Sequence, residues 1–379
     1  MRVAQVVVES SPGGASLFAP LAALAPDLVL AFGSVARLQQ WAPVLGAALG
    51  HASLVGCSTA GEISDEGVTD DSLVVTAVSF GASRAVQVST ELRGMEDSAD
   101  AGGRLASALS RDGLRAVLVF GQGVQINGSA VLSGMTAVVG PGIPITGGLA
   151  GDGGAFARTW ILDQAGVSET RLVCVGLYGD RLVFSHGSYG GWEPFGPARK
   201  VTRCVSNVLY ELDGEPALDV YKRYLGDYAK DLPASGLLFP LVMLAADHQA
   251  LGLTRTILAV DEGSGSLTLA GDIDPDGYLK LMHASTDALV EGAEKAAQAA
   301  QAMRIHQGPT LALMVSCVGR KLVIGGRAEE EVEAVADVFA ADVTAAGFYS
   351  NGEMCPMRQG DECKLHNQTM TISCLSESL

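Results

Sequence analysis

The chain reads GCSTAGEI at residues 56–63 and GFYSNGEM at residues 347–354. Both stretches carry, in the same order, a glycine, four residues with a hydroxyl in the same slot, a second glycine, a glutamate and a large apolar residue. A looser copy, GGLAGD, stands at residues 147–152. A strand-like apolar run and a helix-like segment precede each copy. The sequence therefore predicts one repeated α/β unit with a glycine–acid corner in each copy, and we number the corners in chain order.

Strand-like and helix-like runs follow the same order in two parts of the chain, about residues 28–91 and 116–188. Each part predicts a strand, a helix, a corner and then a hairpin, whose turn lies at residues 81–83 or 179–181. Such a mixture is typical of sheets that contain antiparallel pairs and are covered by helices. We therefore predict a mixed α/β (α+β) fold built from repeated strand–helix–corner–hairpin units.

The chain of 379 residues is long enough for two domains with cores of their own. The polar segment at residues 226–236, which contains Pro233, is the best candidate for a linker between them. We therefore expect an N-terminal domain at residues 1–225 and a C-terminal domain at residues 237–379.

The composition argues against several classes of function. Acidic residues outnumber basic ones by 42 to 25, and a net charge of −17 disfavours nucleic-acid binding. No apolar run approaches the roughly 20 residues of a membrane helix, and the N-terminus resembles a first strand more than a signal peptide. The seven cysteines, an odd number, fit reduced thiols better than a disulfide framework. We expect a cytoplasmic protein without membrane insertion.

Glycines at a turn can adopt positive φ or let a ligand approach the backbone closely, and a neighbouring acid can accept hydrogen bonds. Ordinary tight turns are the alternative. In the ligand-binding interpretation the cleft is lined by Thr59, Gly61, Glu62, Gly151, Asp152, Tyr349, Ser350, Gly352 and Glu353. Arg320 and Arg255 are candidates for fixing a ligand carboxylate, because a guanidinium binds a carboxylate bidentately. Surface ion pairing is the alternative for both.

Thiols and imidazoles gather near the end of the chain. Cys355, Cys363 and His366 are donors that zinc accepts, but the spacing of the two cysteines is not a common zinc spacing, which argues against zinc. A proline follows Cys355, as in short heme-ligation motifs, so Cys355, His366 and His186 are candidate heme ligands. The alternative for His366 is a buried imidazole bonded to a backbone carbonyl. The other histidines are expected at the surface: His51, His248, His283 and His306.

Together these motifs resemble the FIST family (F-box and intracellular signal transduction) over nearly the full chain. The first two corners and residues 208–218 match the N-terminal FIST half, and residues 317–320, the third corner and residues 365–370 match the C-terminal half. The resemblance implies a bacterial signal-input module for a small ligand, with amino acids proposed, and a branch that binds heme b and senses nitric oxide. Because the sequence shows no output segment, signalling would need a separate partner such as a histidine kinase or a cyclic-di-GMP enzyme.

Common enzyme motifs are missing from the sequence, which contains no G-x-S-x-G elbow, P-loop or H-E-x-x-H stretch. We therefore expect a non-catalytic sensor whose corners face a shared cleft, since junctions between domains are preferred positions for pockets. Two alternatives stay open. One is a thiol-dependent enzyme that uses Cys57 or Cys355, and the other is an adaptor that binds no ligand.

Overall fold

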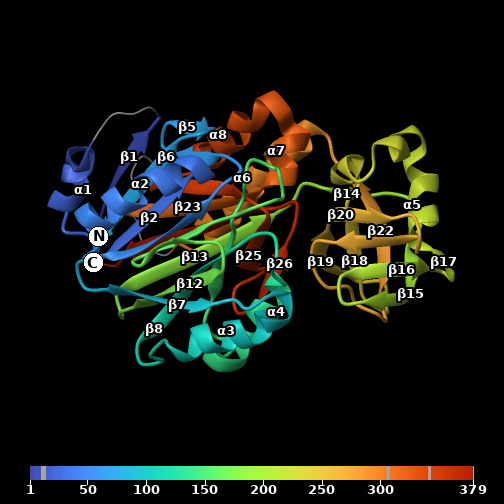
Figure 1. Ribbon diagram of the computed structural model, residues 1–379, viewed down its shortest axis with the longest axis horizontal. Helices are drawn as coiled ribbons and strands as arrows, with labels where there is room; N and C mark the ends of the chain where they lie inside the picture. The colour runs from blue at the N-terminus through green and yellow to red at the C-terminus, as the bar shows by residue number, and fades with distance from the viewer. Residues whose placement is uncertain (10–13, 305–307, 340–342, 379) are drawn as a thin grey trace.

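The computed structural model describes residues 1–9, 14–304, 308–339 and 343–378. The chain forms a body of three six-stranded sheets and, beside it, a nine-stranded sheet from residues 193–283 (Figure 1). The nine-stranded sheet is yellow and orange and lies to the right of the figure. The two chain ends meet on the opposite side of the body, where the amino group of Met1 lies 3.2 Å from Glu377. Within the described ranges, no helix combines the length and the apolar character needed to cross a membrane.

The three sheets of the body share one strand order, in which only the third and fourth strands are parallel. The first sheet contains β1 (Arg2–Val8), β6 (Leu73–Ser79), β2 (Leu28–Gly33), β3 (Ser53–Ser58), β10 (Ile161–Asp163) and β11 (Gly166–Ser168). The second contains β7 (Arg84–Glu91), β12 (Arg171–Tyr178), β8 (Leu114–Gly121), β9 (Ile145–Leu149), β25 (Gly352–Pro356) and β26 (Cys363–His366). The third contains β13 (Leu182–Tyr189), β27 (Met370–Glu377), β23 (Thr310–Cys317), β24 (Val343–Ser350), β4 (Glu62–Ser64) and β5 (Gly67–Thr69).

Each sheet is completed by a hairpin from another repeat. After each corner the chain leaves its own sheet, so that β4 pairs with β24, β10 with β3, and β25 with β9. The hairpins predicted around residues 81–83 and 179–181 are wrong, because β6 and β7 belong to different sheets, as do β12 and β13. Backbone hydrogen bonds therefore interlock the three repeats, and the chain crosses over at the corners.

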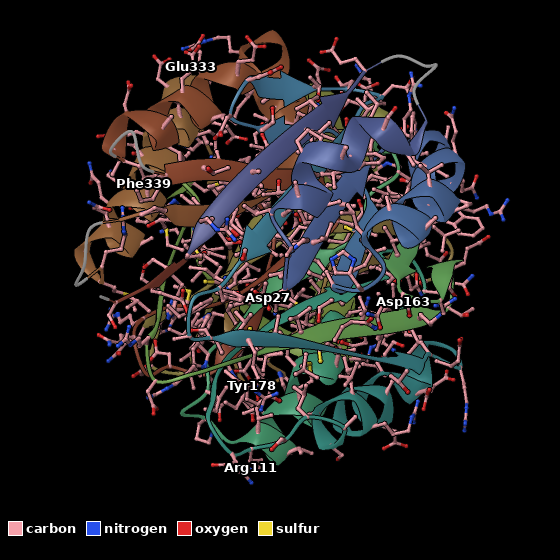
Figure 2. All side chains as sticks on the ribbon, turned by 90° about the vertical axis from the view of Figure 1, so that its left-hand side faces the viewer. Asp27, Arg111, Asp163, Tyr178, Glu333 and Phe339 are labelled. Carbon is pink, nitrogen blue, oxygen red and sulfur yellow. The ribbon has the colours of Figure 1, made fainter. Side chains whose placement is uncertain are left out.

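The sheets enclose one central core and carry helices on their outer faces. Figure 2 views the body from the side away from the nine-stranded sheet and shows blue, green and orange-brown sectors around a common centre. In that core Phe32, Phe120 and Phe348 pack with ring centroids 4.7, 5.7 and 6.2 Å apart. β2 is buried along its whole length, which explains its continuous apolar run. The outer helices are α1 (Ala19–Ala23), α2 (Val35–Leu49), α3 (Ser98–Ser107), α4 (Gly128–Val139), α6 (Thr286–Ala302), α7 (Val318–Ile324) and α8 (Ala328–Val338).

The predicted fold class is confirmed: mixed sheets with antiparallel hairpins are covered by helices. The third repeat runs from β13 to β27, and the nine-stranded sheet interrupts it between β13 and α6. Helix α5 (Ala217–Leu225) packs against this sheet. Its strands are β14 (Glu193–Pro194), β15 (Arg199–Val205), β16 (Val208–Leu212), β17 (Glu215–Pro216), β18 (Leu241–Leu244), β19 (Ala250–Arg255), β20 (Ile257–Asp261), β21 (Ser266–Leu269) and β22 (Tyr278–His283). Strand pairing crosses the expected boundary at residues 226–236, since β15 pairs with β22 and β16 with β21.

Candidate functional site

The three corners lie against one another where the sheets of the body meet. Each corner donates a backbone N–H to a carbonyl of a neighbouring corner, at equivalent places in the three repeats. These bonds run from Ala60 to Tyr349 (2.9 Å), from Gly151 to Ser58 (2.8 Å) and from Asn351 to Leu149 (3.2 Å). Gly151 has no room for a side chain, because a Cβ there would lie 2.6 Å from the nitrogen of Ala60. The corner sequences are alike because each fits the same interlocked arrangement.

The acid of the third corner, Glu353, is fully buried and bonds to the residue that precedes β27. It accepts hydrogen bonds from Oγ of Ser350 (2.8 Å) and from Oγ1 (2.9 Å) and N–H (3.2 Å) of Thr369. Burial raises the pKa of Glu353 from 4.5 to about 8, although these hydrogen bonds favour the charged form. The hydrogen bonds that the Glu353 carboxylate accepts thus come from Ser350 and Thr369 of the protein itself.

The acids of the other two corners are also bonded to the protein. Glu62 accepts from Thr59 and from both the N–H (3.0 Å) and the Oγ (2.8 Å) of Ser72, and burial raises its pKa. Asp152 accepts three backbone N–H groups, from residues 156–158, at 2.7–2.9 Å. The three predicted acids therefore organise their corners.

The first corner borders a cavity of about 700 Å³ that we name the lysine pocket. Lys321, on α7, lines this pocket; its Nζ donates to the carbonyl of Ala60 (3.0 Å) and forms an ion pair with Asp70. The same Nζ lies 4.9 Å from the ring centre of Tyr349. The predicted residues that line this pocket are Thr59, Gly61, Glu62 and Asp152.

The third corner reaches a second and smaller cavity, of about 210 Å³, between the body and the nine-stranded sheet. We name it the amide pocket, because four asparagines line it: Asn127, Asn207, Asn351 and Asn367. Asn367 is 2% exposed, and its Oδ1 is buried without a hydrogen-bond partner among the described residues. Asn351 donates from Nδ2 to the carbonyl of Gly123 (3.2 Å), and its Oδ1 is likewise buried without a partner there. Two amide oxygens at this pocket are thus buried without a partner among the described residues.

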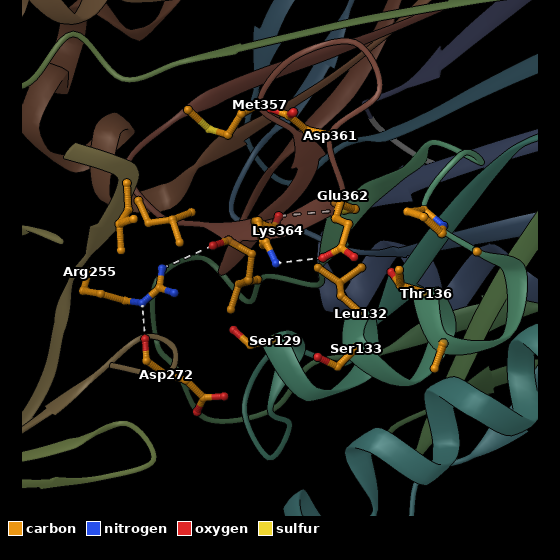
Figure 3. A pocket seen from close by; sticks show the side chains of 17 residues that line it. Ser129, Leu132, Ser133, Thr136, Arg255, Asp272, Met357, Asp361, Glu362 and Lys364 are labelled. Carbon is orange, nitrogen blue, oxygen red and sulfur yellow. Dashed lines mark hydrogen bonds and ion pairs between the residues drawn. The ribbon is translucent and has the colours of Figure 1, made fainter. Parts of the chain in front are cut away.

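A wider groove of about 980 Å³ runs beside the amide pocket, between α4 and the nine-stranded sheet (Figure 3). Its wall includes Arg255, which is 3% exposed and donates to the carbonyls of Asp272 (2.9 Å), Thr254 (3.0 Å) and Leu365 (3.2 Å). Burial lowers the pKa of Arg255 to about 10. The bond to Leu365 fixes the nine-stranded sheet to β26 across the seam between that sheet and the body. Arg255 forms no ion pair with the described residues, so surface ion pairing is wrong for it.

Comparisons with known proteins identify the family. Residues 27–215 match the family model of the FIST N domain, and residues 217–356 match that of the FIST C domain. The chain belongs to the FIST family. FIST domains are signal-transduction sensor domains for small ligands.

Individual proteins resemble this FIST protein only over a short segment or at low sequence identity. It is 37% identical over 89 residues to an uncharacterized protein of Methanocaldococcus jannaschii. The matched residues make up 23% of this chain and only 17% of that protein's length. A crystal structure of cyanuric acid hydrolase from A. caulinodans is 11% identical over 99% of this chain and 98% of that one, with a TM-score of 0.34. A second cyanuric acid hydrolase structure is 11% identical, covers 99% of both chains and has a TM-score of 0.30.

Arg320 of this FIST protein is completely buried and serves the fold. Its Nη2 lies 2.8 Å from Glu331 and donates to the carbonyl of Leu289 (2.7 Å), and its Nη1 donates to the carbonyl of Gly190. These contacts join α6, α7 and α8 to the loop before the nine-stranded sheet. Surface ion pairing is therefore wrong for Arg320 as well, and its donors are engaged within the chain.

The predicted cysteine and histidine ligands converge, but in the interior. Sγ of Cys355 lies 3.8 Å from Nδ1 of His186, and Nε2 of His366 lies 2.8 Å from the carbonyl of Cys355. This is the buried imidazole that was the alternative for His366, and burial lowers its pKa to about 4. None of these three side chains lines the lysine pocket, the amide pocket or the wider groove whose wall includes Arg255. A porphyrin needs open space beside its ligand atom, and these buried side chains line none of the three cavities described, so the arrangement does not fit a heme.

The same interior holds the remaining thiols proposed for chemistry. Cys363 is 6% exposed, and the described residues contain no group of three side chains placed to hold a metal ion. Cys57 lies in the central core, and burial raises its pKa and that of Cys355, so both thiols are kept in the protonated form, which is a poor nucleophile. His51, His248 and His283 are exposed, as predicted, and His306 lies outside the described residues.

Reasoning from the sequence missed the residues that distinguish the two pockets, Lys321 and Asn367. One signal was present. The motif at residues 365–370 contains two amides, Asn367 and Gln368, directly after His366. Of the predicted ligand residues, Gly151, Tyr349, Ser350, Gly352 and Glu353 belong to the packed corners and line neither pocket.

Proposed function

We propose that this FIST protein is a non-catalytic signal-input protein that binds a small ligand in the amide pocket. The observation that carries the proposal is Asn367, whose side-chain Oδ1 is buried and has no hydrogen-bond partner within the described part of the chain. Leaving such a group unbonded costs about 1–3 kcal/mol, and nearly all buried polar groups in folded proteins have a partner. A bound ligand supplies that partner.

The position of the pocket supports a role in signalling. Gln368, next to Asn367, donates from Nε2 to the carbonyl of Leu237 beside the nine-stranded sheet (3.2 Å). Its own carbonyl accepts from Nε1 of Trp192 (3.0 Å), on the chain that leads into that sheet. A ligand that prefers one position of Asn367 therefore biases a segment bonded to both parts of the molecule, which is how binding shifts a conformational equilibrium. The changed surface would then be read by a partner such as a histidine kinase or a cyclic-di-GMP enzyme.

The family resemblance implies two ligand classes, an amino acid or heme with nitric oxide, and heme would need a site other than the amide pocket, whose volume is about 210 Å³. A visible absorption spectrum of the full chain mixed with heme tests the second. Uptake with a Soret band that shifts in a histidine or cysteine variant would support heme, and no uptake would remove heme from the proposal. The variants are His366→Ala, His186→Ala and Cys355→Ala.

Equilibrium dialysis of the full chain against a defined mixture of amino acids, amides, amines, carboxylates and sugars tests the amide pocket itself. We expect the wild type to retain at least one compound and the double variant Asn351→Leu/Asn367→Leu to lose it. Lys321→Met, in the lysine pocket, is the matched control and should keep it. Retention that survives the double substitution but disappears in Lys321→Met would move the site to the lysine pocket, and retention of nothing would contradict the proposal.

A further inference from the structure

The two pockets occupy equivalent positions in the first and third repeats. Asp70 in the lysine pocket and Asn367 in the amide pocket each precede a residue with positive φ, Asp71 (φ 60°) and Gln368 (φ 63°). In both repeats the next residue, Ser72 or Thr369, binds the corner glutamate. Asn367 is therefore the counterpart of Asp70.

The counterpart of Lys321 follows from strand register. The glycine that opens each corner pairs with the neighbouring parallel strand, Gly347 with Met314 and Gly147 with Val119. Lys321 follows Met314 by seven residues, and Ile126 follows Val119 by seven. Ile126 also lines the amide pocket, so the place of the lysine is taken there by a shorter, apolar side chain.

This comparison shows what the amide pocket lacks. In the lysine pocket the chain's own ammonium group bonds to the corner carbonyl and pairs with Asp70. In the amide pocket the acidic counterpart is a neutral amide, the cationic counterpart is absent from the lining, and none of the described lining residues is charged. A charged ligand group would be buried there without a counter-charge, which is unfavourable.

We propose that the ligand of the amide pocket is a small neutral molecule with an amide-like group, presenting an N–H donor and a carbonyl acceptor side by side. This inference rests on the proposed function. Oδ1 of Asn367 is buried without a partner among the described residues, so an N–H of a ligand amide can donate to it, and the ligand carbonyl can accept from Nδ2 of the same side chain. A second N–H of the ligand reaches Oδ1 of Asn351, in the place that the ammonium of Lys321 takes at the first corner.

Three probes of nearly equal size separate the possible chemistries: propanamide is neutral, propanoate is an anion and propylammonium is a cation. Their binding to the full chain is followed by ligand-observed NMR. We expect propanamide to bind and the two ions to bind roughly tenfold more weakly or not at all. Ile126→Lys should abolish propanamide binding, because the new side chain fills the pocket and donates to Asn367. Lys321→Ile, the reciprocal change at the first corner, should leave it intact.

A second variant, Asn367→Leu, keeps the test decisive if Ile126→Lys fails to fold, and it too should lose propanamide. Propanoate or propylammonium binding as well as propanamide, and competing with it, would overturn the neutral amide class while leaving the pocket as the site. Propanamide binding that persists in Asn367→Leu would overturn the pairing with Asn367. If none of the three probes binds the wild type, the amide class is overturned, and retention of another compound in the dialysis experiment would show that the pocket still functions.

Discussion

Replacing Asn367 with leucine should make the ligand-free protein more stable. The side chain is 2% exposed and its Oδ1 has no hydrogen-bond partner among the described residues, so the folded state bears the cost of removing a polar atom from water without a compensating bond. That cost is about 1–3 kcal/mol, and an apolar side chain of similar shape does not incur it. We expect Asn367→Leu to raise the free energy of unfolding by about 1–2 kcal/mol.

Urea unfolding followed by tryptophan fluorescence measures this change, with ligand removed beforehand. Trp192 is a suitable reporter, since it lies on the chain that enters the nine-stranded sheet and bonds to Gln368. The matched control is Asp70→Leu at the equivalent position. Asp70 has a side chain that is 76% exposed and paired with Lys321, so its replacement should change stability by no more than about 1 kcal/mol and should not stabilise.

A loss of more than about 1 kcal/mol in Asn367→Leu would refute this reasoning, because it would mean that the amide makes favourable hydrogen bonds in the ligand-free protein. Equal stabilisation by Asn367→Leu and Asp70→Leu would also refute it. The gain would then come from added apolar surface and not from removing an unbonded amide.

Further predictions concern the corners. The folded-state pKa of Glu353 is raised from 4.5 to about 8, so its stabilising contribution is complete below pH 4.5 and is lost as pH rises to about 8. Compared with Glu353→Gln over this range, the wild type should lose up to about 1.4 kcal/mol per pH unit in urea unfolding, and parallel pH profiles would contradict the assignment. Gly151→Ala should destabilise by about 3 kcal/mol or more, since its Cβ would meet only backbone atoms, at 2.6–2.9 Å. Gly352→Ala, whose nearest neighbours are leucine side chains at 3.2 Å, should cost about 1 kcal/mol or less, and equal thermal shifts for the two variants would argue against the interlocked corners.

Local patterns in the sequence predicted the repeated elements well. Apolar runs such as residues 28–33 predicted the central strands, because a strand buried on both faces needs apolar side chains throughout. The glycines and acids of the corners were also visible, because the same packing constraint acts three times in one chain. The apolar strands and the glycine–acid corners could be predicted because each is encoded by residues close together in the sequence.

The exchange of strands between sheets could not be predicted in the same way. Nothing in residues 73–91 distinguishes a hairpin from two strands that enter different sheets, since the turn at residues 81–83 suits both. Asn367 posed the same difficulty. An asparagine in a turn is ordinary, and its meaning comes from being buried without a partner, which only the tertiary structure shows.

Hydrogen–deuterium exchange of the full chain, with and without propanamide, tests the central claim most directly. The account predicts slower exchange on both sides of the seam, at residues 123–128 and 365–369 of the body and at residues 268–271 of the nine-stranded sheet, because these segments line the amide pocket. It predicts no change around Lys321. Protection confined to the lysine pocket, or to one side of the seam, would contradict the claim that a ligand in the amide pocket couples the two parts of the protein.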